Sequence, residues 1–295
     1  MASDNGTAPG TAAGPNPTRV GQVVDAHQHF WDLAAHEQPF LNLPGNEPLL
    51  RNFGLADLRP LAAAAGVTAT VVVQTVMEPG ETTELLGLAA GGDLVAGVVG
   101  WVDLAAGDVA DALAALRARP DGALLRGIRH PLLMEPDPDW LARPAIRHGL
   151  AALSAAGLCF DLVLPPGLLP AATAAARACP GLTFVLDHLG NPDLTAEPAL
   201  GWLNALGEFA ALPNTAAKLS GVLAAGQDRV RPFYEAALAA FGPGRLMYGS
   251  DWPVCTLSAG YPDVLATARA LTVDLAVAER AAIFGGTARR IYGLR

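Results

Sequence analysis

The stretch VVDAHQHFWD at residues 23–32 places an aspartate and two histidines directly after two valines. Consecutive valines favour a β-strand. Alternate side chains of a strand share a face, so Asp25, His27 and His29 are predicted to point the same way. If they point into a closed barrel, three titratable groups share a cavity of low dielectric constant. Titratable groups in such a cavity must either take part in a reaction or pair with one another.

Further polar residues stand at the ends of later apolar runs. They are Arg129 and His130 in GIRH, His188 in VLDH, Lys218 and Ser220 in NTAAKLS, and Asp251 in YGSD. Histidine and aspartate side chains move protons in catalysis and also bind metal ions. Four of the six histidines of the chain follow such runs, which favours a shared site over scattered core histidines.

Short β-branched runs alternate along the chain with alanine- and leucine-rich runs. Strands are expected within 22–29, 67–75, 93–102, 123–130, 157–165, 182–188, 214–220 and 245–251. Helices are expected within 55–65, from about 81, within 108–119 and 140–156, after 168, and within 198–210, 231–241 and 263–271. Eight such units predict an α/β fold, a parallel (β/α)8 TIM barrel, with one or two extra helices in 273–295. No GxGxxG motif follows the first strand, which disfavours an open dinucleotide-binding sheet.

In such a barrel, active sites lie at the carboxyl ends of the strands. Four residues are therefore the candidate catalytic set: His27, His29, His188 and Asp251. Asp251 is the candidate general base at the barrel mouth. The candidates for contacting a substrate are Arg129, His130, Lys218, Trp31 and Trp252.

The composition limits the class of partner. The net charge is -9 and no dense lysine or arginine tract is present, so a nucleic-acid partner is not expected. The longest uncharged run, 60–77, begins with Pro60 and contains Gly66, which disfavours a membrane span. Three cysteines without CxxC spacing favour reduced thiols and a cytoplasmic location. The expected partner is a small molecule, and the oligomeric state is left open.

Residues 1–20 are rich in Gly, Ala, Pro, Thr and Asn and lack the features of a signal peptide. They are predicted to form a disordered tail, followed by a single domain at 21–295.

The motifs HQHFWD, GIRH, VLDHLGNP, KLSG and RLMYGSDWPV, in this order and spacing, resemble the amidohydrolase superfamily in its branch of sugar-acid and pyrone lactonases. The resemblance extends from Gln22 to the C-terminus and is closest to the L-fuconolactonase and L-rhamnonolactonase group. It implies a barrel with His27, His29, His188 and Asp251 as the active-site set, and a small lactone as substrate.

The resemblance also bears on metal binding. Two-metal members of the superfamily carry a carboxylated lysine or a glutamate on strand four and a histidine on strand five, whereas these strands here end in GIRH and VLP. The resemblance therefore implies one divalent ion, with zinc first among candidates, held by His27, His29 and Asp251, or no metal at all.

In the expected mechanism, Asp251 takes a proton from water and returns it to the leaving oxygen, while the three histidines, or a metal held by His27 and His29, polarise the carbonyl. Two alternatives stay open. One is a metal-dependent amidohydrolase or decarboxylase of the same superfamily. The other is a catalytically silent barrel that only binds a ligand.

Overall fold

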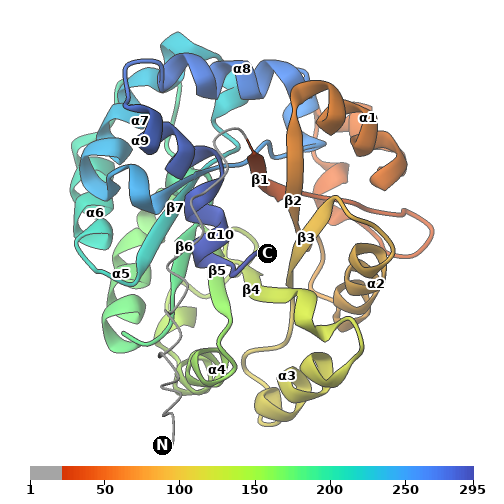
Figure 1. The fold of residues 1–295 in the computed structure, drawn as a ribbon. Helices are drawn as coiled ribbons and strands as arrows, with labels where there is room; N and C mark the ends of the chain where they lie inside the picture. Colours follow the sequence, from red (N-terminus) through yellow and green to blue (C-terminus); the bar gives the residue numbers. More distant parts are fainter. Residues whose placement is uncertain (1–21) are drawn as a thin grey trace, which may run out of the picture.

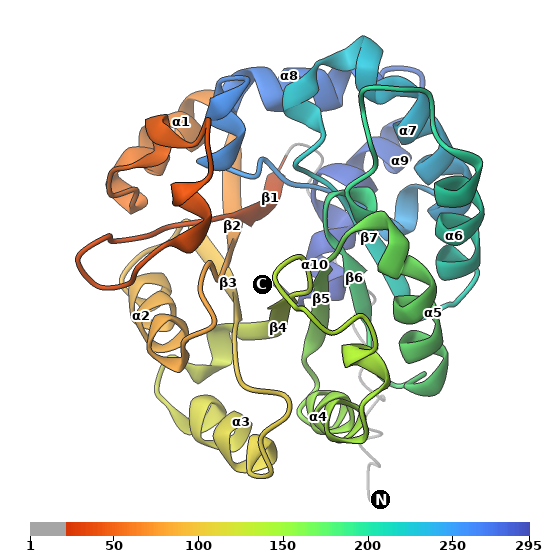
Figure 2. The same cartoon turned by 180° about the vertical axis from the view of Figure 1, so that it is seen from behind.

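The computed structural model of the protein describes residues 22–295. Eight parallel strands lie side by side in the order in which they occur in the chain. Helices surround this ring of strands, as Figures 1 and 2 show from opposite sides. The predicted (β/α)8 barrel is confirmed. The predicted tail at 1–20 lies outside the described residues.

The strands are β1 (Val23–Gln28), β2 (Val67–Val73), β3 (Val95–Gly100), β4 (Leu125–Pro131), β5 (Cys159–Val163), β6 (Phe184–Leu186), β7 (Thr215–Leu219) and β8 (Leu246–Tyr248). The helices that follow them are α1 (Leu55–Ala65), α2 (Pro79–Ala90), α3 (Val109–Ala118), α4 (Pro144–Ala155), α5 (Leu169–Ala178), α6 (Leu200–Ala210), α7 (Gln227–Phe241) and α8 (Tyr261–Leu271). Two short helices, α9 (Val277–Ala281) and α10 (Thr287–Ile291), enclose a π-helical turn at Ala282–Gly286. Within residues 22–295, no helix combines the length and the apolar character that crossing a membrane requires.

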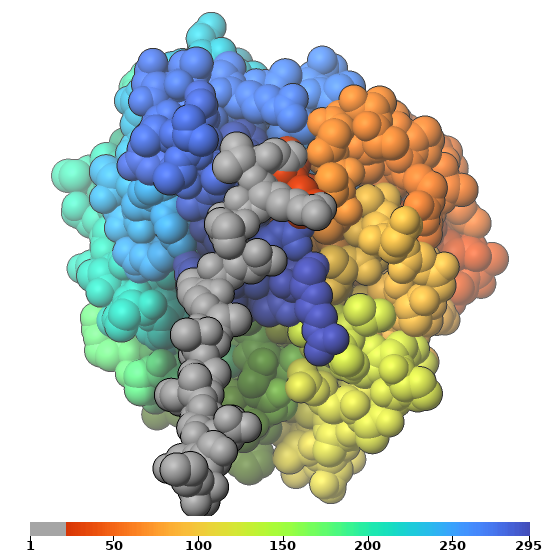
Figure 3. Space-filling view, viewed as in Figure 1, coloured from red at the N-terminus to blue at the C-terminus, as the bar shows by residue number. Residues whose placement is uncertain are grey.

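The strands are rich in apolar residues because both of their faces are covered. In β2, VTATVVV, only Thr68 is exposed. One apolar cluster lies between the strands and the outer helices. A second fills the inside of the barrel and includes Val71, Met247 and, from the C-terminal segment, Tyr292 and Leu294. Figures 1 and 3 show this segment, in dark blue, over the centre of one end of the barrel.

The barrel closes between β1 and β8 at a line of contact that we call the barrel seam. The amide of His29 donates a hydrogen bond to the Trp252 carbonyl (2.7 Å), and the amide of Asp251 donates to the His27 carbonyl (2.8 Å). A Cβ on Gly249 would lie only 2.7 Å from the Cβ of His27. The two strands can approach this closely because residue 249 has no side chain.

The register of β1 against β2 shifts between Asp25 and Gln28. The Asp25 carboxylate accepts a hydrogen bond from the hydroxyl of Tyr261 (3.0 Å), which belongs to the outer helix α8. His27 and His29 instead turn to the barrel mouth. The prediction that all three side chains share a face is therefore wrong for Asp25, because the register shift interrupts the alternation.

Replacing Gly249 by alanine should destabilise the protein, because the added methyl group would push the barrel seam apart. Overpacking of this kind costs roughly 1–3 kcal/mol of the free energy of unfolding. Urea unfolding measures this loss. The control is Gly207→Ala at an exposed position of α6, where an added Cβ meets nothing within 4 Å and alanine favours the helix. Equal stability of Gly249→Ala and the wild type would contradict a tightly packed seam.

Candidate active site

Two histidines of the first strand present their Nε2 atoms to the barrel mouth. His27 is fully buried and His29 nearly so, and the two Nε2 atoms lie 3.1 Å apart. His29 Nδ1 donates a hydrogen bond to the carbonyl oxygen of Val73 at the end of β2 (2.8 Å). Because a carbonyl can only accept, the neutral His29 ring carries its proton on Nδ1 and leaves a lone pair on Nε2.

Asp251 and His188 lie just beyond the short strands β8 and β6, and both have left-handed backbone conformations. Their φ values are 59° and 54°, a region that costs energy for residues with a side chain. Asp251 Oδ1 lies 3.4 Å from His29 Nε2 and 3.6 Å from His27 Nε2. The turn in the backbone thus brings a carboxylate from the last strand to the histidines of the first.

His188 approaches the same group from the side of β6 and β7. Its Nδ1 lies 2.9 Å from the Oγ of Ser220, and its ring centroid is 4.7 Å from that of His27. Gly221 makes room for this ring, since a Cβ there would lie 2.6 Å from His188 Nδ1. Burial lowers the pKa of His188 below its ordinary value, which favours a neutral ring near pH 7.

The carboxylate of Asp251 is held in its ionised form. Burial alone would raise its pKa, but His188, His29 and His27 outweigh that effect and lower the pKa of Asp251 to about 2. Burial and the neighbouring Lys218 ammonium hold the pKa of His27 well below its ordinary value. Burial thus disfavours a positive charge on His27 and His188, whereas the carboxylate of Asp251 stays ionised.

A network of charged side chains lies beneath the histidines. The Lys218 ammonium is fully buried. Its Nζ lies 2.6 Å from Asp161 Oδ2, 3.0 Å from Asp187 Oδ1 and 3.0 Å from His27 Nδ1. The hydroxyl of Tyr292 in the C-terminal segment donates to the same Asp161 oxygen (2.7 Å). A chain of contacts thus runs from the C-terminal segment to the mouth of the barrel.

Arg129 supplies the second cation of this network. Its Nη1 donates to Asp187 Oδ2 (3.3 Å) and its Nη2 donates to the carbonyl oxygen of Gln74. Its Nε is buried and has no partner among the described residues. Burial opposes ionisation of Asp187, but Lys218, His27 and Arg129 together hold the pKa of Asp187 well below its ordinary value.

The alternation of strand residues predicts that Asp187 faces away from the site and serves as a structural partner of helix or loop amides. This prediction is wrong, because β6 ends at Leu186 and the chain then turns at His188, so that both side chains reach His27. Asp161 and Tyr292 were not identified from the sequence. A lone charge within the apolar run GLCFDLVLP is the signal that could have revealed Asp161.

Two predicted substrate-contacting residues are engaged by other side chains of the protein. Lys218 has no exposed surface and sits beneath the histidines. The ring of His130 stacks on Trp140 with centroids 3.9 Å apart, and its Nε2 lies 3.4 Å from Glu135 Oε2. His130 therefore faces the loop between β4 and α4.

The two predicted tryptophans support the mouth by packing. Trp31 packs edge-on against Phe40 and Phe53, and its Nε1 donates to the Arg51 carbonyl oxygen. Trp252 packs against Phe53 in the same way. Both tryptophans are at least 95% buried, so little of either ring is exposed.

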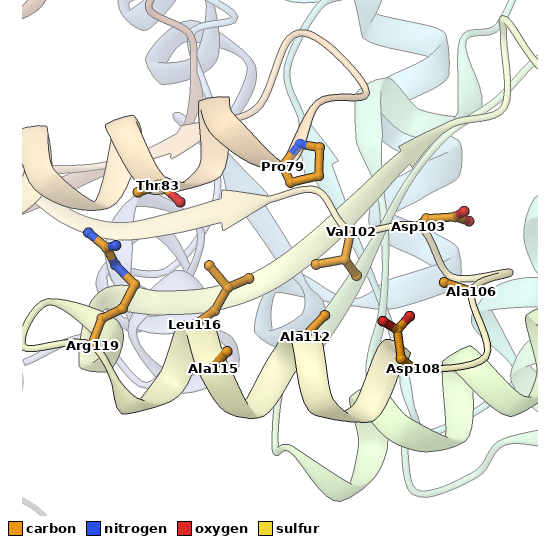
Figure 4. A pocket seen from close by; sticks show the side chains of 10 residues that line it. All are labelled: Pro79, Thr83, Val102, Asp103, Ala106, Asp108, Ala112, Ala115, Leu116 and Arg119. Atoms are coloured by element: carbon orange, nitrogen blue, oxygen red, sulfur yellow. The ribbon is translucent and has the colours of Figure 1, made fainter.

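A groove on the outer surface is separate from this site. It has a volume of about 440 Å³ and runs between α2 and α3, where Pro79, Val102 and Leu116 line it (Figure 4). None of the four candidate catalytic residues borders it.

The histidines and Asp251 fit one zinc ion. The distances between His27 Nε2, His29 Nε2 and Asp251 Oδ1 are 3.1, 3.4 and 3.6 Å. Zinc binds such atoms at about 2.0–2.2 Å in tetrahedral sites, which places neighbouring ligand atoms about 3.4 Å apart. A second group of suitable side chains, His27, Asp187 and His188, does not fit. The Lys218 ammonium already lies 3.0 Å from both His27 Nδ1 and Asp187 Oδ1.

Comparison with known proteins gives consistent matches over nearly the whole chain. A family model described as amidohydrolase matches residues 24–294. An L-fucono-1,5-lactonase of Burkholderia ambifaria is 38% identical over 91% of this chain and 94% of that protein. An L-fucono-1,5-lactonase of Burkholderia multivorans is also 38% identical, over 92% of this chain and 96% of that protein. The crystal structure of an amidohydrolase from Burkholderia multivorans with bound zinc has a TM-score of 0.87 and 36% sequence identity, covering 93% of this chain and 100% of that one.

Changing Asp161 to asparagine should destabilise the protein strongly, because the buried Lys218 ammonium would lose the nearer of its two carboxylates. Breaking a buried ion pair costs about 3–5 kcal/mol, and urea unfolding measures the change. The control is Asp93→Asn, which breaks an exposed ion pair with Arg59 and should cost less than about 1 kcal/mol. If Asp161→Asn lowered the free energy of unfolding as little as Asp93→Asn does, the dependence of Lys218 on the Asp161 carboxylate would be contradicted.

Proposed function

The chain belongs to the amidohydrolase family, and from this we propose that it opens the ring of a sugar-acid lactone, with L-fucono-1,5-lactone as the first substrate to test. The observation that carries the proposal is the meeting of Asp251 with His27, His29 and His188 at one barrel mouth. Relatives that are 38% identical over nine tenths of the chain are named L-fucono-1,5-lactonases. The resemblance to lactonases noted from the sequence motifs is confirmed.

Asp251 is the proposed general base. A lactone opens when water adds to the carbonyl carbon and the bond to the ring oxygen breaks. The ionised Asp251 takes one proton from the attacking water and passes it to the departing ring oxygen, so that a hydroxy acid is released. Its pKa of about 2 keeps the carboxylate of Asp251 ionised throughout the neutral range.

His188 is the proposed donor to the carbonyl oxygen. When the Ser220 hydroxyl donates to His188 Nδ1, the proton of the neutral ring is on Nε2. The Nε2–H group can then stabilise the negative charge that develops on the carbonyl oxygen.

We propose zinc as the cofactor, held by His27, His29 and Asp251. The three ligand distances support this. A bound divalent ion supplies Lewis-acid polarisation of the carbonyl and lowers the pKa of water. His29 keeps its lone pair available for such an ion, because its other nitrogen donates to Val73.

For the substrate hydroxyls we propose Arg129, whose Nε is a buried donor without a partner among residues 22–295. Contacts of the substrate with His130, Trp31 and Trp252 stay predictions, as does the cytoplasmic location. Lys218 is assigned a different role, because its ammonium is enclosed by Asp161, Asp187 and His27.

Changing Asp251 to asparagine should lower kcat for the lactone at least about 100-fold, because an amide cannot accept the proton of water. Asparagine tolerates the left-handed backbone, so the variant should still fold. The measurement is acid release from a panel of sugar-acid lactones, followed with a pH indicator. Asp93→Asn is the surface control. If the wild type and Asp251→Asn give the same background rate, the protein is a silent barrel. Release of carbon dioxide without lactone hydrolysis would favour a decarboxylase.

Removing metal should lower the rate of lactone hydrolysis without abolishing it, because Asp251 and His188 remain and a lactone is an activated ester. The same assay, run on chelator-treated and zinc-loaded protein, measures the difference. Complete loss of activity that zinc restores would contradict catalysis by Asp251 and His188 without a metal. Identical rates for chelator-treated and zinc-loaded protein would show that zinc takes no part in the reaction.

A further inference from the structure

The Nδ1 atom of His27 has a donor and an acceptor within reach at once. Lys218 Nζ lies 3.0 Å away and Asp187 Oδ1 lies 3.3 Å away. An ammonium group only donates and a carboxylate only accepts, whereas one ring nitrogen either accepts or donates. The neutral ring therefore has two forms. Nδ1 either accepts from Lys218, with the proton on Nε2, or donates to Asp187, with a lone pair on Nε2.

The neighbour of His27 Nε2 decides which form is favoured. His29 Nε2 carries a lone pair, because its other nitrogen donates to Val73, and it lies 3.1 Å from His27 Nε2. Two lone pairs at this distance repel each other. With no cation between them, the favourable form has the proton on His27 Nε2, donated to His29. Nδ1 must then accept from Lys218.

A cation held by His27, His29 and Asp251 reverses this requirement, because it needs the lone pair of His27 Nε2. The single ring proton then resides on Nδ1, with Asp187 as its acceptor. The ring loses one proton at Nε2 and gains one at Nδ1, so its charge does not change. Histidines that bind metal commonly donate their other N–H group to a carboxylate.

We propose that Lys218 and Asp187 each stabilise one tautomer of the His27 ring. Lys218 stabilises the tautomer of the metal-free site, and Asp187 stabilises the tautomer of the metal-bound site. Both are positioning residues. Lys218 keeps a partner in either form, because Asp161 lies 2.6 Å from its Nζ and is itself held by Tyr292. The proposal rests on the zinc site of the proposed function, but it does not depend on the lactone.

Lys218 is the only lysine of the 295 residues, and it is fully buried. A cation this close to His27 opposes a second cation at the metal site. Its placement therefore weakens zinc binding while it organises the site without zinc. A residue that served packing alone would not combine these two effects.

The first experiment measures zinc affinity by competition with a chromophoric chelator. Lys218→Met should bind zinc on the order of tenfold more tightly or better, because it removes the support of the metal-free form and the repulsion between like charges. Asp187→Asn should bind zinc about 10–100-fold more weakly, because a metal-bound histidine loses its carboxylate acceptor. Tyr234→Phe, which removes a buried hydroxyl that has no partner among the described residues, is the control and should leave the affinity unchanged.

The critical result is that the two variants change zinc affinity in opposite directions. If both residues only supported the fold, both variants would bind zinc more weakly, and this outcome would overturn the proposal. Failure of wild-type protein to bind zinc would overturn it as well. Lactone hydrolysis, measured separately, would then still decide the proposed reaction.

A second measurement observes the wild-type protein and does not depend on the folding of the Lys218 and Asp187 variants. Nitrogen-15 labelling of lysine gives one side-chain signal, that of Lys218, and labelling of histidine reports which ring nitrogen carries the proton. The His27 signals are assigned by comparison with His27→Gln. Adding zinc should move the His27 proton from Nε2 to Nδ1 and shift the lysine signal. A proton on Nδ1 in both preparations, or a lysine signal that does not respond to zinc, would refute the proposal.

Discussion

Charge buried inside the barrel has to be neutralised there, and the arrangement of the site depends on this constraint. Lys218 and Arg129 are the two permanent cations beneath the mouth, and they are matched by Asp161 and Asp187. Asp251 is the third carboxylate, and among residues 22–295 it has no permanent cation beside it, only histidines. The uncompensated negative charge thus lies where a cation, or a proton in transit from water, can be accepted.

The backbone conformation that positions the Asp251 carboxylate is energetically unfavourable. His188 and Asp251 adopt left-handed conformations, and the hydrogen bond from the Asp251 amide to the His27 carbonyl holds one of them in place. Gly249 and Gly221 provide the space in which these turns pack against His27 and His188. Conformational strain in the loops is therefore offset by the close fit of the two terminal strands, which is a common property of functional sites.

The eight strand and helix units were predictable because strands covered on both faces read as continuous apolar runs. His27, His29, His188 and Asp251 were predictable as a group because each follows such a run. Asp25 and Asp187 were not, since alternation along a strand fails at a register shift and beyond a strand's last residue. The position of Lys218 beneath the histidines depends on how the barrel strands are staggered, which residue type and local pattern do not encode. Tyr292 reaches the site from a terminal segment for which the sequence suggests only packing.

The barrel seam also determines when, during its synthesis, the protein acquires a complete active site. Ser250 and His27, which meet there, are 223 residues apart in the sequence, so a chain leaving the ribosome carries its first two histidines long before their carboxylate partner exists. Contacts across such a separation form late, because the entropy of closing the loop must be met first. Catalytic ability is therefore a property of the completed ring of strands, and a partly made barrel holds the histidines without the base.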